Sequence, residues 1–129
     1  MNITINKTTK TYNRVSDIID SLTINPNPEA VAVLEEIGTN SSIDEVREMT
    51  ARALVKRNEP ASLSVVITQR GKGINDMSTV VAMSTINCLL SLEDKEEAMK
   101  VLENTISGEG IEEDVRENAR SVKALMALS

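Results

Sequence analysis

The chain has few of the side chains that enzymes use for acid–base or metal chemistry. Its 129 residues include no histidine, one cysteine (Cys88) and one tyrosine (Tyr12). Histidine is the commonest general base and the commonest metal ligand, and a single thiol forms neither an internal disulfide nor a metal site. Cys88 also has no activating group close to it in the sequence, so we interpret it as a buried small apolar residue. We therefore assign no catalytic residue, metal site or cofactor, and we do not expect an enzyme.

The remaining candidates for a binding site are basic residues in the middle of the chain. Residues 46–75 include six basic and two acidic side chains, whereas residues 93–117 include ten acidic and three basic ones. Such segregation usually gives two solvated faces. It also suits a basic middle that receives an acidic protein partner, or the acidic third of a second copy. The candidate partner-binding residues are Arg47, Arg52, Lys56, Arg57, Arg70 and Lys72.

Nucleic-acid or anion binding through the same basic residues is the alternative. The net charge of −6 argues against a non-specific nucleic-acid binder, although it leaves a local patch open. The glycines at 71 and 73, around Lys72, precede an expected helix and resemble an anion-binding nest. They lack the spacing of a phosphate-binding loop, and a turn between helices needs the same glycines, so we favour a turn.

The elements that would position these residues are helices. Apolar residues make up 40% of the chain, but there is no phenylalanine or tryptophan, and aliphatic cores suit helices better than strands. Residues 1–11 lack helical periodicity and are expected to be a flexible arm. Residues 12–129 are expected to form one domain of seven helices. Helix starts are predicted at Asn27 and Pro28, at a capping box from Ser42, and at a cap formed by Asn75 or Asp76. Helix ends are predicted at Gly38 and at Gly108 and Gly110.

The central helix is expected over residues 77–92, which carry no charged side chain. Apolar residues surround this stretch in a helical projection, so we expect it to be buried on nearly every side. It is too short and too rich in serine, threonine and asparagine to cross a bilayer. The N-terminal residues do not form the apolar core of a signal peptide. These features predict a soluble, cytoplasmic protein.

The sequence repeats with a period near 34 residues. Residues 29–35 (EAVAVLE) match residues 97–103 (EAMKVLE), and the middle pair falls half-way, with Val46 aligned to Val80. A repeat of this length made of two helices is typical of an α-solenoid, in which each unit buries its faces against its neighbours. We expect three helix pairs, over residues 28–57, 60–91 and 93–128, preceded by one helix.

The second helices resemble those of HEAT-like (armadillo-type) repeats. Asp44 precedes Val46 and Arg47, and Asp114 precedes Val115 and Arg116, in the Asp–Val–Arg pattern of that family. The middle unit departs from it, since Val81 stands in place of the arginine. The resemblance implies an all-α, right-handed short solenoid, in which these arginines are more often structural links than ligand contacts. Tetratricopeptide repeats rank second because their aromatic landmarks are missing.

This architecture predicts a non-catalytic scaffold or adaptor for protein–protein interaction. Binding is expected on the surface made by the second helices, over residues 43–57, 76–92 and 111–128, with a protein partner of acidic character. An enzyme resembling helical-repeat lyases is the last alternative, because no acid–base pair can be assigned. The apolar C-terminal end, from Leu125 to Leu128, either closes on its own helix pair, which we favour, or forms a homodimer contact.

Overall fold

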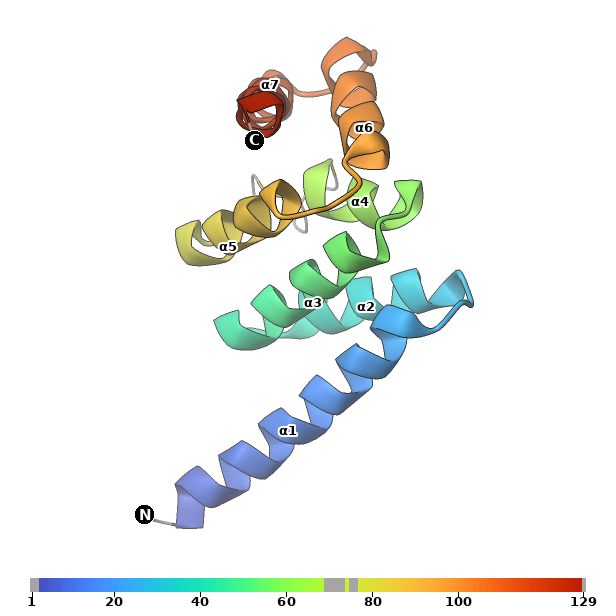
Figure 1. Cartoon of the computed structure of the whole chain (residues 1–129). Helices are drawn as coiled ribbons and strands as arrows, with labels where there is room; N and C mark the ends of the chain where they lie inside the picture. The colour runs from blue at the N-terminus through green and yellow to red at the C-terminus, as the bar shows by residue number, and fades with distance from the viewer. Residues whose placement is uncertain (1–2, 69–73, 75–76, 129) are drawn as a thin grey trace.

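The computed structural model describes residues 3–68, 74 and 77–128. These residues form helices joined by short connections, and no strand occurs among them, so the all-α class is confirmed (Figure 1). The helices are α1 (Ile3–Ile24), α2 (Glu29–Asn40), α3 (Asp44–Arg57), α4 (Pro60–Ile67), α5 (Thr79–Leu90), α6 (Glu96–Ser107) and α7 (Glu113–Leu128).

The helices after α1 stack in two layers (Figure 1). In one layer α2 contacts α4 and α4 contacts α6, and in the other α3 packs closely on α5, which touches α7 more loosely. The helix α1 packs on α3 and α2, and so takes the place of a second helix ahead of the first pair. This packing of neighbour on neighbour is the arrangement that an α-solenoid would have.

The interior repeats with nearly the expected period, but the alignment of Val46 with Val80 is wrong by one residue, because the buried counterpart of Val46 is Val81. Thr50, Thr85 and Ala119 are buried at equivalent positions of α3, α5 and α7, spaced by 35 and 34 residues. Both threonine hydroxyls bond within their own helix: Thr50 Oγ1 lies 2.9 Å from the carbonyl of Arg47 and 3.2 Å from that of Val46, and Thr85 Oγ1 donates to the carbonyl of Val81 (2.8 Å). A buried hydroxyl bonded inside its own helix needs no partner from another element.

Helix α1 begins earlier than the sequence suggested. We expected residues 1–11 to be a flexible arm and the first helix to start at Tyr12, whereas the helix runs from Ile3. Residues 3–11 are mostly β-branched or polar and have no clear apolar stripe, but residues 3–24 contain neither proline nor glycine. No residue in the stretch therefore breaks the helix, which ends at Ile24 just before the Asn-Pro-Asn-Pro sequence.

Of the predicted helix boundaries, the start at Asn27 is right, whereas the end at Gly38 and the capping box at Ser42 are wrong. Asn27 Oδ1 accepts the N–H of Glu29 (3.0 Å), as expected of a residue that starts a helix. Gly38 does not end α2, which continues to Asn40. Ser42 forms no capping box, because α3 follows Ile43 without a side-chain cap. The predicted caps Asn75 and Asp76 lie outside the described residues, and Ser78 Oγ caps α5 by accepting the N–H of Val81 (3.3 Å).

The expectation that the uncharged helix is buried on nearly every side is also wrong. Only Val81, Thr85 and Leu89, a single stripe at i, i+4 and i+8, are buried in α5. Val80 and Met83 are 66% and 53% exposed. The helix packs on α3 along one side and has only a loose neighbour in α7, so its outer side faces solvent.

Candidate functional site

Two of the predicted contact residues, Arg52 and Lys56, lie one turn apart on the exposed side of α3. The guanidinium of Arg52 pairs with Glu48, and the Glu48 carboxylate also accepts the hydroxyl of Ser84 on α5 (3.0 Å). The Arg52–Glu48 pair lies within α3, whereas the Ser84 bond joins α3 to α5. The side chain of Arg52 is still 45% exposed, so it can contact a partner while it stays paired with Glu48.

Arg57 belongs to the interior, and we remove it from the candidate contact residues. Its side chain is 4% exposed and pairs through Nε with Glu59 (2.6 Å). The guanidinium also donates to the carbonyls of Leu22 (2.7 Å) and Asn25 (2.6 Å). Because these are the free carbonyls where α1 ends, Arg57 ties α1 to α3 and supplies the donors that the last turn of a helix lacks.

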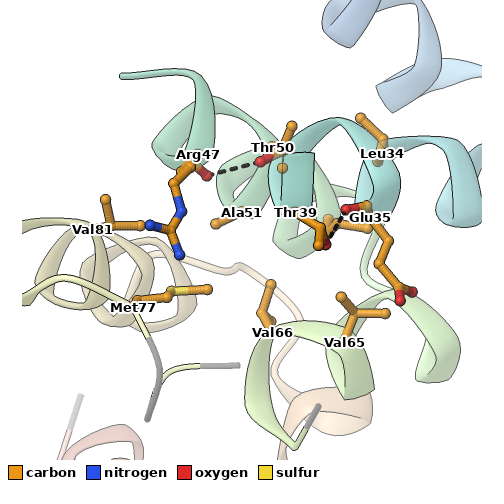
Figure 2. A pocket seen from close by; sticks show the side chains of 12 residues that line it. Leu34, Glu35, Thr39, Arg47, Thr50, Ala51, Val65, Val66, Met77 and Val81 are labelled. Carbon is orange, nitrogen blue, oxygen red and sulfur yellow. Dashed lines mark hydrogen bonds between the residues drawn. The ribbon is translucent and has the colours of Figure 1, made fainter. Parts of the chain in front are cut away.

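Arg47 lines a small cavity between the two layers (Figure 2). The wall is mostly apolar and comes from α2 to α5, with Met77 and Val81 on the side toward which Arg47 extends. The cavity measures about 30 Å³, which is space for one or two water molecules and far less than a metabolite needs. We assign it no ligand.

Arg116, the counterpart of Arg47 in the last unit, has a structural role. Its guanidinium donates to the carbonyls of Ile106 (2.9 Å), Gly108 (3.2 Å) and Ile111 (3.3 Å). It thereby closes the turn between α6 and α7, where Gly108 follows the end of α6 as predicted. This arginine is an internal link, but its partners are these carbonyls and Glu113 (3.5 Å), whereas the expected partner Asp114 accepts the N–H of Val115 (3.0 Å).

The rest of the predicted contact zone is not brought together by the described structure. Arg70 and Lys72 lie outside the described residues, as do Gly71 and Gly73 of the proposed turn. Within the described residues the zone therefore consists of Arg52 and Lys56 on the surface and Arg47 at the cavity.

The feature that sequence reasoning missed is the exposed face of α5. Thr79, Val80, Met83 and Asn87 are exposed and uncharged, on a helix that lies between α3 and α7 (Figure 1). In a chain with 26% charged residues, a solvent-facing helix side without charge is unusual. The absence of charge was visible in the sequence, but it indicates burial as readily as a surface reserved for a partner.

Cys88 lies on α5 beside this face and is half-buried. Burial raises the pKa of its thiol, while the positive charges of Lys56 and Arg52 act in the opposite direction and lower it. Because burial is the larger effect, the thiol stays protonated near neutral pH, and the thiolate is the nucleophilic form. The environment of Cys88 is that of a packed side chain.

The described residues contain no group of three or more His, Cys, Asp or Glu side chains placed to hold a metal ion. None of the helices in that part of the chain is long and apolar enough to cross a membrane. A scan against family models, a search of curated proteins and a search of solved structures each returned no match.

Proposed function

We propose that this chain is a short HEAT-like repeat module that binds another protein, without catalysing a reaction, through the outer side of its second helices. The observation that supports this function is the exposure of Val80 and Met83 in the first half of α5. Apolar side chains gain about 25 cal/mol for each Å² that they remove from water, so these two favour a covered state.

The flanks of α5 have the composition expected of the rim of an interface. Glu48, Arg52 and Lys56 lie on the α3 side, and the α7 side carries Glu117 and Arg120, all on the neighbouring helices. Protein interfaces commonly combine an apolar centre with a charged, solvent-accessible rim, where the charges set orientation and association rate more than affinity. The second-helix surface has this division.

A matched pair of substitutions tests the proposal. Val80→Asp places a charge in the α5 face, and Val33→Asp makes the same change at a 42% exposed position of α2, in the other layer. The full-length chain and both variants are immobilised and exposed to lysate of the source cells at low and high salt. Wild type and Val33→Asp should retain the same one or two proteins, and Val80→Asp should lose them.

Retention of the same proteins by all three chains would contradict this choice of surface. Bound nucleic acid that is released by salt and is indifferent to Val80→Asp would instead support a site among the basic residues. Unfolding curves of the two variants establish that both are folded.

A further inference from the structure

We propose that a partner of this surface is a second copy of the chain, whose α7 lies antiparallel across the α5 face. This inference rests on the proposed function, because it names an occupant for the same surface. Each copy exposes apolar residues on both helices, and charged residues lie at a fixed distance from them.

The apolar parts of the two helices match in size and spacing. On α5 the exposed pair is Val80 and Met83, and on α7 it is Leu125 and Leu128, which are 44% and 85% exposed. Both pairs are three residues apart, so each forms one patch on one side of its helix. Met126, between the two leucines, is buried and holds α7 to its own unit, which leaves the leucines available to a neighbour.

The charges beside these patches match in register. Residues of α3 and α5 that are about 35 positions apart lie at the same level, because Ser78 donates to Asp44 (3.5 Å) and Ser84 donates to Glu48 (3.0 Å). Lys56 therefore lies nine to ten residues beyond the α5 patch, which is about 14 Å along the helix axis. Glu117 precedes the midpoint of Leu125 and Leu128 by the same number of residues, again about 14 Å.

Antiparallel docking brings Glu117 of one copy to Lys56 of the other. Both side chains are accessible, since Lys56 is exposed and the side chain of Glu117 is 63% exposed. A parallel arrangement of the same patches would carry Glu117 in the opposite direction, about 14 Å to the other side of the α5 patch and away from Lys56. The antiparallel arrangement also sets the two helix dipoles against each other favourably.

The contact is reciprocal, because each copy carries both halves of it. A two-fold axis that places the α7 of one copy on the α5 of the other also makes the reverse contact, and so the assembly closes as a dimer. Each half of the interface then buries four apolar side chains and pairs one lysine with one glutamate.

The test is the mass of the full-length chain in solution, measured by sedimentation equilibrium or light scattering at several concentrations and at low and high salt. We expect a dimer that weakens as salt rises. Met83→Glu should be monomeric, whereas Val33→Glu, an equivalent change on α2, should remain a dimer. Lys56→Glu and Glu117→Lys should each raise the dimer dissociation constant about three- to tenfold.

The decisive measurement is the double variant with both charge reversals, in which the ion pair is restored in the opposite sense. Its dissociation constant should return toward that of the wild type. Because Glu117 also pairs with Arg120 (2.5 Å), Glu117→Gln provides a second variant that adds no charge beside that arginine. It should weaken the dimer in the same direction.

Three results would overturn the inference: a wild type that is monomeric at every concentration, a dimer that survives Met83→Glu, or charge reversals that do not compensate. None of these is the result that contradicts the proposed function. A monomeric chain that still captures a protein, and loses it on Val80→Asp, would leave that function intact and assign the surface to a different partner.

Discussion

Arg57 shows how a residue counted among surface charges can instead hold the fold. Its guanidinium joins the end of α1 to α3 through the carbonyls of Leu22 and Asn25, with its charge balanced by Glu59. We predict that Arg57→Lys lowers the free energy of unfolding by about 2–3 kcal/mol, because a lysine cannot reach both carbonyls and Glu59 in one geometry. Urea denaturation measures the loss.

The neighbouring residue is the control for this prediction. In the Met83→Glu background, which is expected to be monomeric, Lys56→Ala removes an equivalent charge from an exposed position, so it should change the free energy of unfolding by less than about 0.5 kcal/mol. Equal losses for Arg57→Lys and Lys56→Ala would show that the buried network does not stabilise the end of α1.

The thiol of Cys88 gives a prediction about pH. Burial disfavours the thiolate and raises the pKa. The rate of alkylation by iodoacetamide should therefore rise with pH, and the midpoint of that rise should lie at higher pH than for an exposed peptide thiol. Lys56 lowers this pKa, and Lys56→Ala should therefore move the curve to still higher pH. A midpoint at lower pH than that of the peptide thiol would contradict the burial argument.

At the scale of elements, α2 and α3 approach each other at Gly38. A Cβ atom built there would lie 2.5 Å from Thr50 Oγ1, closer than such contacts occur. Alanine normally stabilises a helix by about 1 kcal/mol relative to glycine. Here we predict that Gly38→Ala destabilises the protein by about 1–3 kcal/mol, because the two helices must move apart.

A double-mutant cycle separates this close approach from helix propensity. In a Thr50→Ala background the obstructing hydroxyl is gone, so Gly38→Ala should cost much less or should stabilise, as seen by chemical denaturation. If the alanine destabilises equally in both backgrounds, the contact with Thr50 does not explain the glycine.

Gly38 also shows where sequence patterns predict the elements and where they fail. Periodicity, proline and glycine predicted seven helices, the start near Asn27 and the end at Gly108, since these signals are local. A glycine that ends a helix and a glycine that admits a neighbouring helix have the same local signature. Only the position of Thr50, twelve residues later in the sequence, distinguishes them.

The candidate site was predicted less well, because it depends on which side of each helix a neighbour covers. The lack of charge over residues 77–92 indicated that α5 was special, but we assigned it to the interior. The buried stripe at Val81, Thr85 and Leu89 shows that one side is enough to hold the helix. Arg57 is the opposite case. Its charge suggested a position on the surface, but its side chain is buried and donates to carbonyls more than thirty residues earlier in the chain.

At the scale of the whole molecule, packing of neighbour on neighbour has a consequence for stability. The helices α6 and α7 pack closely on each other, but they join the rest of the chain mainly through α4, because α7 touches α5 only loosely. In such stacks a unit can open while distant units stay folded. The last pair is therefore expected to open as a unit, with less free energy than global unfolding requires.

Native-state hydrogen exchange tests this expectation with one substitution of a buried aliphatic residue near each end of the stack of helices. Val122→Ala, at a 3% exposed position of α7, should weaken the last pair by about 1–2 kcal/mol and speed exchange in α6 and α7. The amides of α2 and α3 should keep their wild-type rates. Ile19→Val, at a 2% exposed position of α1, should have the converse effect.

The two variants together distinguish a stack of units from a single cooperative core. If either one accelerated exchange by the same factor in every helix, the chain would unfold as one unit and the loose contact between α5 and α7 would not limit cooperativity. Local acceleration near each substitution would mean instead that the α5 face lies close to the boundary between two units. A partner that bridges α5 and its flanking helices would then add stability across that boundary, and the last pair should exchange more slowly when the surface is covered.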